Sequence, residues 1–359
     1  DCHTPHANLP KSNPKSSIHP DNLAKTCGAC HQNVNASFLT FDPHANPGDA
    51  SRNPYVYWIY IGMTGLLLGV FGFFGLHGLL WLQRALVGKL RGEFPPHEHT
   101  GAHVRRFHGM QVAMHVTIVV SFLLLAATGL PLKFAEAPWS ASLMSIFGGA
   151  QVAGWLHRFA GVVTFGYFAW HISAVLYSVV VKKERGFFWG PRSMMPQPKD
   201  LFDFIGMMKY FFYLGPRPKF DHFTYWEKFD YLAVFWGVAI IGISGLVLWF
   251  PTTATMLLPG WALNAAYVIH SDEALLATGF IFLFHFFHTH LRPEAFPMDT
   301  VVFTGRMPLA TFKHERPLEY ERLMKEGKFE ERLAPAPTAL ELRLTYIFGF
   351  TAVAIGVLL

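Results

Sequence analysis

The sequence of 359 residues has little cysteine and little charge. Its three cysteines, Cys2, Cys27 and Cys30, all precede the first long apolar run, which excludes a framework of paired disulfides. Only 15% of the residues are charged, and the net charge of +5 is scattered, which excludes a nucleic-acid-binding surface. The chain opens without an initiator methionine or signal peptide and stops inside an apolar run. We therefore expect a piece of a longer protein, cut at both ends.

Apolar side chains are abundant instead. Hydrophobic residues make up 52% of the chain, 35 residues are phenylalanine, and the mean hydropathy is +0.27, which favours a membrane protein. A bilayer crossing needs about 20 apolar residues, so the sequence predicts five complete spans and a truncated sixth. The predicted spans are 55–82, 112–132, 152–181, 231–250 and 267–291, with the truncated one at 344–359.

The predicted fold is an all-α membrane protein, a transmembrane helix bundle that carries an irregular N-terminal haem c segment. A short aromatic-rich stretch, 201–214, is expected to form an interfacial helix rather than a span. The expected organisation is a haem c segment at 1–54, a cytochrome b bundle at 55–295, a cytoplasmic segment at 296–340 and the start of the sixth span at 341–359.

Residues 1–54 are polar and lack helical or strand periodicity, so we expect them to fold around something other than an apolar core. The stretch CGACH has the spacing of a c-type haem attachment motif. Cys27 and Cys30 would bind the porphyrin vinyl groups, and His31 would be the proximal iron ligand. A zinc knuckle is the alternative, but it needs two more cysteines or histidines at regular spacing.

A second haem c is indicated by Cys2 and His3, which have the form of the end of another such motif. The distal iron ligands must come from elsewhere in the segment. The local candidates are His6, His19 and His44, of which His44 is favoured.

The loops carry an orientation signal. Basic residues cluster after the first, third and fifth spans, whereas 133–151 contains only Lys133 and 251–269 contains none. The positive-inside rule then makes the basic loops cytoplasmic and the N-terminal segment periplasmic. Covalent haem attachment outside the cytoplasm agrees with this orientation. The predicted location is the bacterial inner membrane, in contact with lipid, as a multi-pass protein.

Histidines within the spans are the main candidate ligands, because ionisable groups in apolar spans are costly and mark function. By depth, His157 pairs with His270 at an outer b haem, and His115 pairs with His285 at an inner one. His171 competes for the inner iron or serves a third haem. Two imidazoles per iron suit electron transfer in a helix bundle. The alternative is that these histidines hydrogen-bond to neighbouring helices or line a water cavity.

Other polar residues near the span ends have two interpretations each. His108, His288 and His290 lie near the cytoplasmic boundary, as interface residues or as part of a quinone site. Asp272 and Glu273 either accept protons at a periplasmic-side quinone site or cap the start of the fifth helix, and capping is favoured.

Several stretches of 104–295 carry a family resemblance: RRFHGMQVAMH ending at His115, SFLLLAATGLPLKF, LHRFAG with His157, FWGVAIIGISGLVL, and His270 to His285. This part resembles the dihaem cytochrome b subunits of respiratory formate dehydrogenases and nickel-iron hydrogenases. In that family two helix-borne histidine pairs bind two b haems, and the last ligand helix gives one histidine to each. The chain departs from the family in two ways. His270 and His285 are fifteen residues apart, where the family has fourteen, and His171 is an extra histidine.

The resemblance implies a quinone near the inner haem. The candidate contacts are Arg105, Arg106, His108 and His288. The stretches DCHTPH and HPDNLAKTCGACH resemble the end of multihaem c cytochromes, and the fusion resembles the cytochrome b/multihaem c quinol oxidoreductases of metal-respiring bacteria.

The expected function is therefore membrane electron transfer, as a quinol oxidoreductase. Menaquinol would pass electrons through two, or with His171 three, b haems to at least one haem c, and onward to a periplasmic c-type cytochrome or redox subunit. The alternative is a non-catalytic haem b anchor that relays electrons to or from a separate periplasmic dehydrogenase or reductase. A third class is a structural haem carrier without redox turnover.

Overall fold

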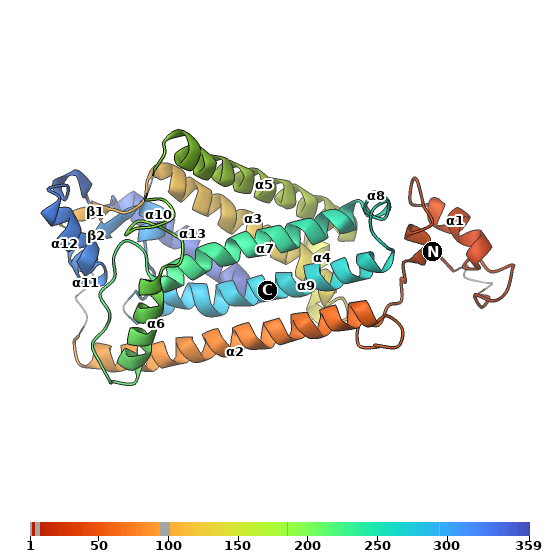
Figure 1. Ribbon diagram of the computed structural model, residues 1–359, viewed down its shortest axis with the longest axis horizontal. Helices are drawn as coiled ribbons and strands as arrows, with labels where there is room; N and C mark the ends of the chain where they lie inside the picture. The colour runs from red at the N-terminus through yellow and green to blue at the C-terminus, as the bar shows by residue number, and fades with distance from the viewer. Residues whose placement is uncertain (1, 4–7, 94–100, 185, 294) are drawn as a thin grey trace. The chain divides into compact units, whose positions relative to one another are not determined.

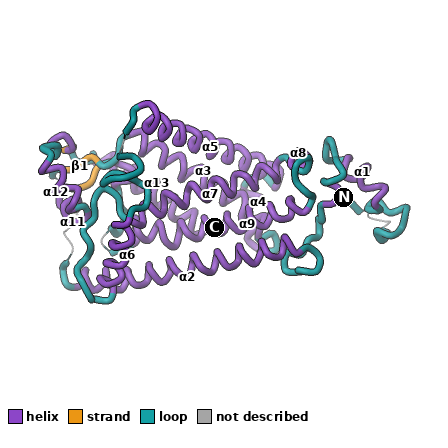
Figure 2. The backbone as a smooth tube through the Cα atoms, viewed as in Figure 1, coloured by secondary structure: helices purple, strands orange, loops and turns teal. Residues whose placement is uncertain are grey.

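The computed structural model describes residues 2–3, 8–93, 101–184, 186–293 and 295–359. The chain is about 67% helical, and within these ranges six helices are long and apolar enough to cross a membrane (Figures 1 and 2). The six are α2 (Pro54–Leu90), α3 (Gly109–Lys133), α5 with its π-helical end η2 (Ala150–Val181), α7 (Tyr225–Trp249), α9 with the π-helical turns η3 and η4 (Trp261–Leu291), and α13 (Ala339–Leu358). The prediction of an all-α, multi-pass membrane protein is confirmed at this level.

The sixth helix is longer than its sequence pattern suggests. Thr338 and Glu341 form a capping box, in which each side chain bonds to the other's backbone N–H, and α13 begins directly after Thr338. The helix has 20 residues, enough to cross a bilayer. The predicted start of the sixth span at residue 344 is wrong because hydropathy alone leaves out the polar first turn that the cap brings into the helix. That the span is truncated stays a prediction.

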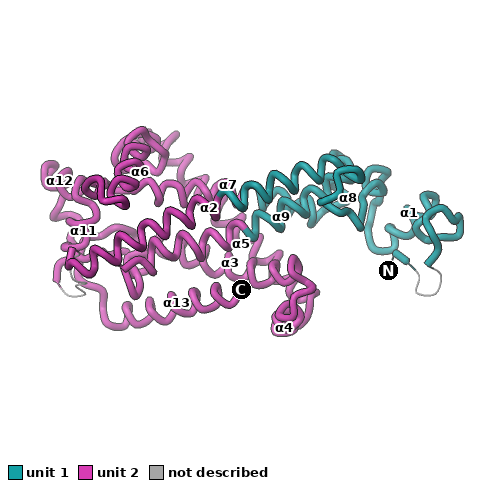
Figure 3. The backbone as a smooth tube through the Cα atoms, turned by 90° about the horizontal axis from the view of Figure 1, so that it is seen from below, with its two compact units in different colours: residues 1–69, 239–275 teal, residues 70–238, 276–359 magenta. Residues whose placement is uncertain are grey.

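The chain divides into two compact units, drawn in different colours in Figure 3. One unit consists of residues 1–69 and 239–275, and the other of residues 70–238 and 276–359. Helices α2, α7 and α9 each contribute residues to both units.

In the first unit, the N-terminal segment is hydrogen-bonded to the connection between α7 and α9. The side-chain amide of Asn35 donates to the backbone oxygen of Thr252 at 2.9 Å, and that of Asn264 donates to the backbone oxygen of Asp42 at 2.7 Å. These bonds attach the irregular segment to the end of the helical part of its own unit. The remaining elements of this unit are α1 (Pro20–Gly28), η1 (Phe38–Thr40) and α8 (Pro251–Ala254).

In the second unit, α3 packs against α5, α4 (Pro138–Ile146) and α13. The stretch predicted as an interfacial helix is helical, as α6 (Pro198–Phe211), which begins with a capping box of Gln197 and Asp200. Its position at the membrane interface stays a prediction. Its buried Phe211 joins an aromatic core cluster. The buried members of that cluster are Trp81, Ala85, Met207, Phe211, Phe220, Trp226, Phe280 and Phe284.

The segment expected at 296–340 folds into short helices and strands and pairs with β1. We call residues 103–105 together with 301–334 the small cap. A three-stranded antiparallel sheet in the order β2-β1-β3 pairs His103 with both Pro308 and Ala334. Strands of two or three residues are too short to show an alternating pattern, which is why the sequence does not predict them. The elements are β1 (His103–Arg105), α10 (Val301–Thr304), β2 (Arg306–Pro308), α11 (Leu309–Glu315), α12 (Pro317–Lys325), η5 (Glu330–Arg332) and β3 (Leu333–Ala334).

Candidate functional site

The CGACH motif lies at the C-terminal end of α1, where the backbone turns. The N–H groups of Cys30 and His31 both donate to the backbone oxygen of Cys27, at 3.2 and 2.9 Å. This turn brings the backbone of Cys30 and His31 back towards Cys27. Haem attachment at the motif stays a prediction. Burial and the neighbouring thiol of Cys2 raise the pKa of Cys27, so the complete motif and the partial motif at Cys2 lie near each other.

His3 and His44 form the histidine pair of this segment. Their ring centroids are 6.3 Å apart. Two imidazoles on opposite sides of one metal need about this distance, since a ~2 Å metal–nitrogen bond and roughly 1.2 Å from nitrogen to centroid apply on each side. The structure therefore places the favoured distal candidate, His44, beside His3.

The other histidines of the segment have different surroundings. The ring of His31 lies 5.0 Å from that of Phe38. The Nδ1 atom of His19 accepts from the backbone of Asp21 at 3.3 Å, which caps α1. This contact favours a structural role for His19. His6 lies outside the described residues.

Within the spans, His157 and His270 each have an oxygen of another helix within hydrogen-bond distance of Nδ1. The Nδ1 atom of His270 lies 3.0 Å from the backbone oxygen of Ile241, and that of His157 lies 3.0 Å from the hydroxyl oxygen of Thr128. A carbonyl only accepts, and the Thr128 hydroxyl already donates to Leu124 at 2.6 Å, so each imidazole is the donor. The lone pair of each ring is then on Nε2, the arrangement that metal-ligating histidines use.

For His285, the oxygen acceptor at Nδ1 is a carboxylate. Its Nδ1 atom lies 2.9 Å from Asp230 of α7. His115, His285 and His290 are close enough to interact electrostatically. The pairing of His115 with His285 at one iron stays a prediction. Among the described residues, the buried Nδ1 atoms of His115 and His290 have no hydrogen-bond partner. The sequence placed His290 at the membrane boundary and did not connect it with His115.

The π-helical turns account for the unusual histidine spacing of α9. The turn η3 (Ile281–His285) ends at His285, and η4 (Phe287–Leu291) follows directly after Phe286. A π-helical turn holds about one residue more than an α-helical turn and often occurs at functional sites. The fifteen-residue separation from His270 therefore has nearly the rotational phase of fourteen α-helical residues. No sequence pattern marks such a turn.

His171 has its hydrogen bond at Nε2 rather than at Nδ1. Its Nε2 atom lies 2.8 Å from the hydroxyl of Tyr231, and its half-buried ring packs edge-on against Phe235. These contacts favour the interpretation that His171 hydrogen-bonds to a neighbouring helix. Its role as a third-haem or inner ligand stays a prediction.

The four candidate quinone contacts have different surroundings. Arg105 and His108 are exposed, and the backbone of His108 begins α3 with a bond to Gln111 at 2.9 Å. His288 is buried in the aromatic cluster, where it donates from Nδ1 to the backbone of its own helix at 2.8 Å and packs on Trp81.

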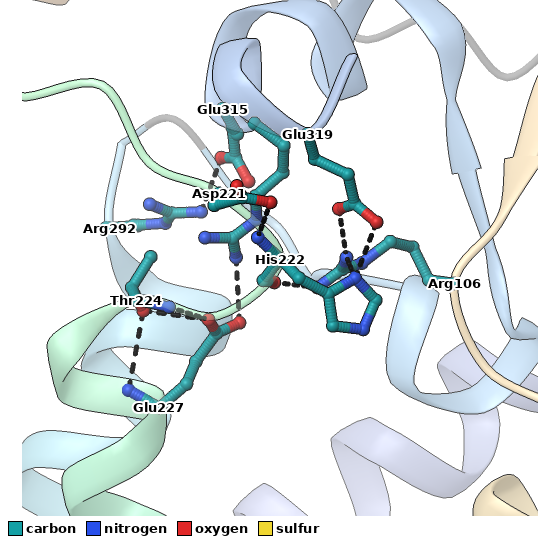
Figure 4. Close-up of polar contacts among 9 residues, drawn as sticks. Arg106, Asp221, His222, Thr224, Glu227, Arg292, Glu315 and Glu319 are labelled. Atoms are coloured by element: carbon teal, nitrogen blue, oxygen red, sulfur yellow. Dashed lines mark hydrogen bonds and ion pairs between the residues drawn. The ribbon is translucent and has the colours of Figure 1, made fainter. Parts of the chain in front are cut away.

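Arg106, directly after β1, belongs to a buried ionic network (Figure 4). Its guanidinium donates to Glu319 at 2.7 Å and to the backbone oxygen of His222 at 2.7 Å. The Nδ1 atom of His222 lies 2.5 Å from the second oxygen of Glu319 and 2.9 Å from Nη1 of Arg106. Burial alone would raise the pKa of Glu319, but the hydrogen bond from His222 and the charge of Arg106 hold it at about 2. Burial lowers the pKa of His222, so the ring is neutral and the carboxylate is ionised.

Two more buried ion pairs continue this network (Figure 4). Arg292 donates to Glu315 at 2.6 Å, and Arg316 donates to Glu227 at 2.8 Å. Together they tie the ends of α7 and η4 to α11 and its junction with α12. The network thus fixes the cap to the membrane-spanning helices of its unit.

Asp272 and Glu273 are not helix caps. Helix α9 begins at Trp261, so both residues lie well inside it, and both are buried. The capping interpretation is wrong because α9 starts six residues before the apolar run that predicted it. Their role as proton acceptors stays a prediction.

No protein-family model matches this chain, and no curated protein matches it. Across the described residues, no group of three or more histidine, cysteine or acidic side chains is arranged to hold a metal ion. Axial ligation of a haem iron needs only two imidazoles. The functional argument therefore rests on how individual histidines are held.

Proposed function

We propose that the protein transfers electrons across a membrane between the quinone pool and c-type haems, through two b haems. The observation that carries this proposal is the shared support of three spanning histidines, His157, His270 and His285. Each has an oxygen acceptor at Nδ1, which leaves Nε2 as the basic nitrogen.

Haem iron, when bound, supplies a reversible one-electron couple. The chain would hold it through His157 and His270 at the outer site and through His115 and His285 at the inner site, the pairs that the sequence predicts. Asp230 keeps the His285 proton on Nδ1 and makes the ring a stronger donor. The buried Nδ1 of His115 has no hydrogen-bond partner, so His115 lacks the support that the other three histidines share, and its place in the inner pair rests on the sequence.

The N-terminal segment would supply the c haem. Cys27 and Cys30 would attach it, and His31 would bind its iron, while His3 and His44 would serve the second one. The bonds from Asn35 and Asn264 hold this segment against the α7–α9 connection, which ends in the helix of His270. This attachment supports short transfer between a c haem and the outer b haem.

The test uses the full-length protein, purified in detergent. Reduced-minus-oxidised spectra should show b-type and c-type bands, and a menaquinol analogue should reduce the c haems. Absence of b-type bands would refute the proposal. Reduction that needs an added partner subunit would instead establish the non-catalytic anchor.

A further inference from the structure

The supports of His157 and His270 are two copies of one local arrangement. In each, a hydroxyl residue is followed by a glycine on one helix, and both face a histidine of the next long helix. We call these two-residue sequences the hydroxyl–glycine pairs. Thr128–Gly129 of α3 faces His157, and Ser244–Gly245 of α7 faces His270. Each copy lies within a single unit.

The glycines are in contact with the imidazole rings. A Cβ atom added at Gly129 would lie 3.1 Å from Cε1 of His157, and one added at Gly245 would lie 3.0 Å from Cε1 of His270. Both distances are shorter than ordinary van der Waals contact, so the ring would have to move by a few tenths of an ångström to accept a methyl group. Only glycine leaves the imidazole where it lies.

The hydroxyls complete each arrangement but differ in importance. Both donate to the backbone four residues earlier, at 2.6 Å for Thr128 and 2.7 Å for Ser244. The Thr128 hydroxyl oxygen lies 3.0 Å from Nδ1 of His157. For His270 the Ile241 carbonyl is closer, at 3.0 Å, and the Ser244 hydroxyl lies at 3.3 Å.

We infer that Thr128, Gly129, Ser244 and Gly245 are positioning residues that set the rotation and the basicity of the two histidines as iron ligands. The inference rests on the proposed haem ligation. The glycine of each pair fixes the plane of the ring, and the acceptor at Nδ1 sets how strongly Nε2 donates electron density. A purely structural packing role would leave the electronic properties of the haem unchanged.

The substitutions separate these roles. Thr128→Val removes this hydroxyl acceptor but keeps the shape, so His157 becomes a weaker donor and the ferrous state is favoured. We expect a three- to tenfold shift in the ratio of reduced to oxidised haem at a fixed potential, a tenfold shift being about 59 mV for one electron. Ser244→Ala should shift it less because the Ile241 carbonyl stays, and Thr128→Ser should restore the wild-type ratio.

The glycine variants report ring rotation. Gly129→Ala and Gly245→Ala should change the electron paramagnetic resonance g values of one low-spin b haem, since these depend on the angle between the axial imidazole planes. Gly154→Ala in α5 and Gly237→Ala in α7 are matched controls, because nothing lies within 4 Å of an added Cβ at either. Both controls should give the wild-type spectrum.

The experiment is a potentiometric titration with parallel resonance spectra on the full-length protein in detergent, normalised to haem content. Shifts in the Thr128 and glycine variants, with unchanged controls, support the inference. If His157→Ala loses a b haem while Thr128→Val and Gly129→Ala match the controls, the inference is overturned and the proposed function stands. If the wild-type protein shows no b haem, both are overturned.

Discussion

Neutralising Glu319 should loosen the small cap without touching any predicted haem ligand. The side chains of Arg106 and Glu319 are only 2% and 4% exposed, so the variant Glu319→Gln leaves a buried guanidinium without its counter-charge. The pKa of Glu319 falls from 4.5 to about 2 in the folded protein. At about 1.4 kcal/mol per unit, this shift corresponds to roughly 3 kcal/mol of stabilisation at pH 7.

The pH dependence follows from the same numbers. Because the folded pKa is the lower one, the stabilisation is fully present above about pH 4.5 and is lost as the pH falls from about 4.5 to about 2. The wild-type cap should therefore become as labile as the Glu319→Gln cap at the acid end of this range. The variant itself should show no such dependence from this group.

Hydrogen exchange measured by mass spectrometry checks the prediction. The backbone N–H groups of Arg106 and Leu309 bond at the cap, to Gly305 at 2.8 Å and to Ala102 at 3.0 Å. In Glu319→Gln their exchange at pH 7 should be roughly a hundredfold faster, the factor that corresponds to ~3 kcal/mol.

The matched control is Glu321→Gln, two residues further along α12. Its carboxylate lies 3.6 Å from Lys219, and both side chains are more than half exposed, so we expect less than about 1 kcal/mol. Equal exchange in the two variants would refute the argument that burial makes the Arg106 pair strong.

Three further predictions concern the proposed electron path. Asp230→Asn should keep both b haems but shift the redox potential of one, because the hydrogen-bond acceptor of His285 loses its charge. Tyr231→Phe, which removes the hydroxyl beside His171, should change neither the haem content nor the potentials, and optical redox titration distinguishes the two variants. Asn264→Ala should speed proteolysis within residues 32–53 and slow reduction of the c haems, since the N-terminal segment loses a bond to α9; unchanged rates in both assays would contradict this. Glu273→Gln should slow menaquinol oxidation with haem content intact if this buried carboxylate accepts a proton, and wild-type turnover would remove it from the mechanism.

The sequence by itself determined the fold class and the identity of the candidate ligands. Apolar runs predict spans because lipid forces the backbone to bond within each helix, and the CGACH spacing is a local chemical pattern. Helix ends were less predictable. Capping boxes such as that of Thr338 add polar turns that hydropathy leaves out.

Only the tertiary structure decided how each histidine is held. Whether an imidazole faces a carbonyl, a carboxylate or a phenol depends on helices far apart in sequence, as with His285 and Asp230, which are 55 residues apart. The same holds for Arg106, which meets Glu319 across 213 residues. Sequence periodicity shows which face of a helix a residue occupies, whereas the partner on that face is chosen by packing between helices, and no local pattern records it.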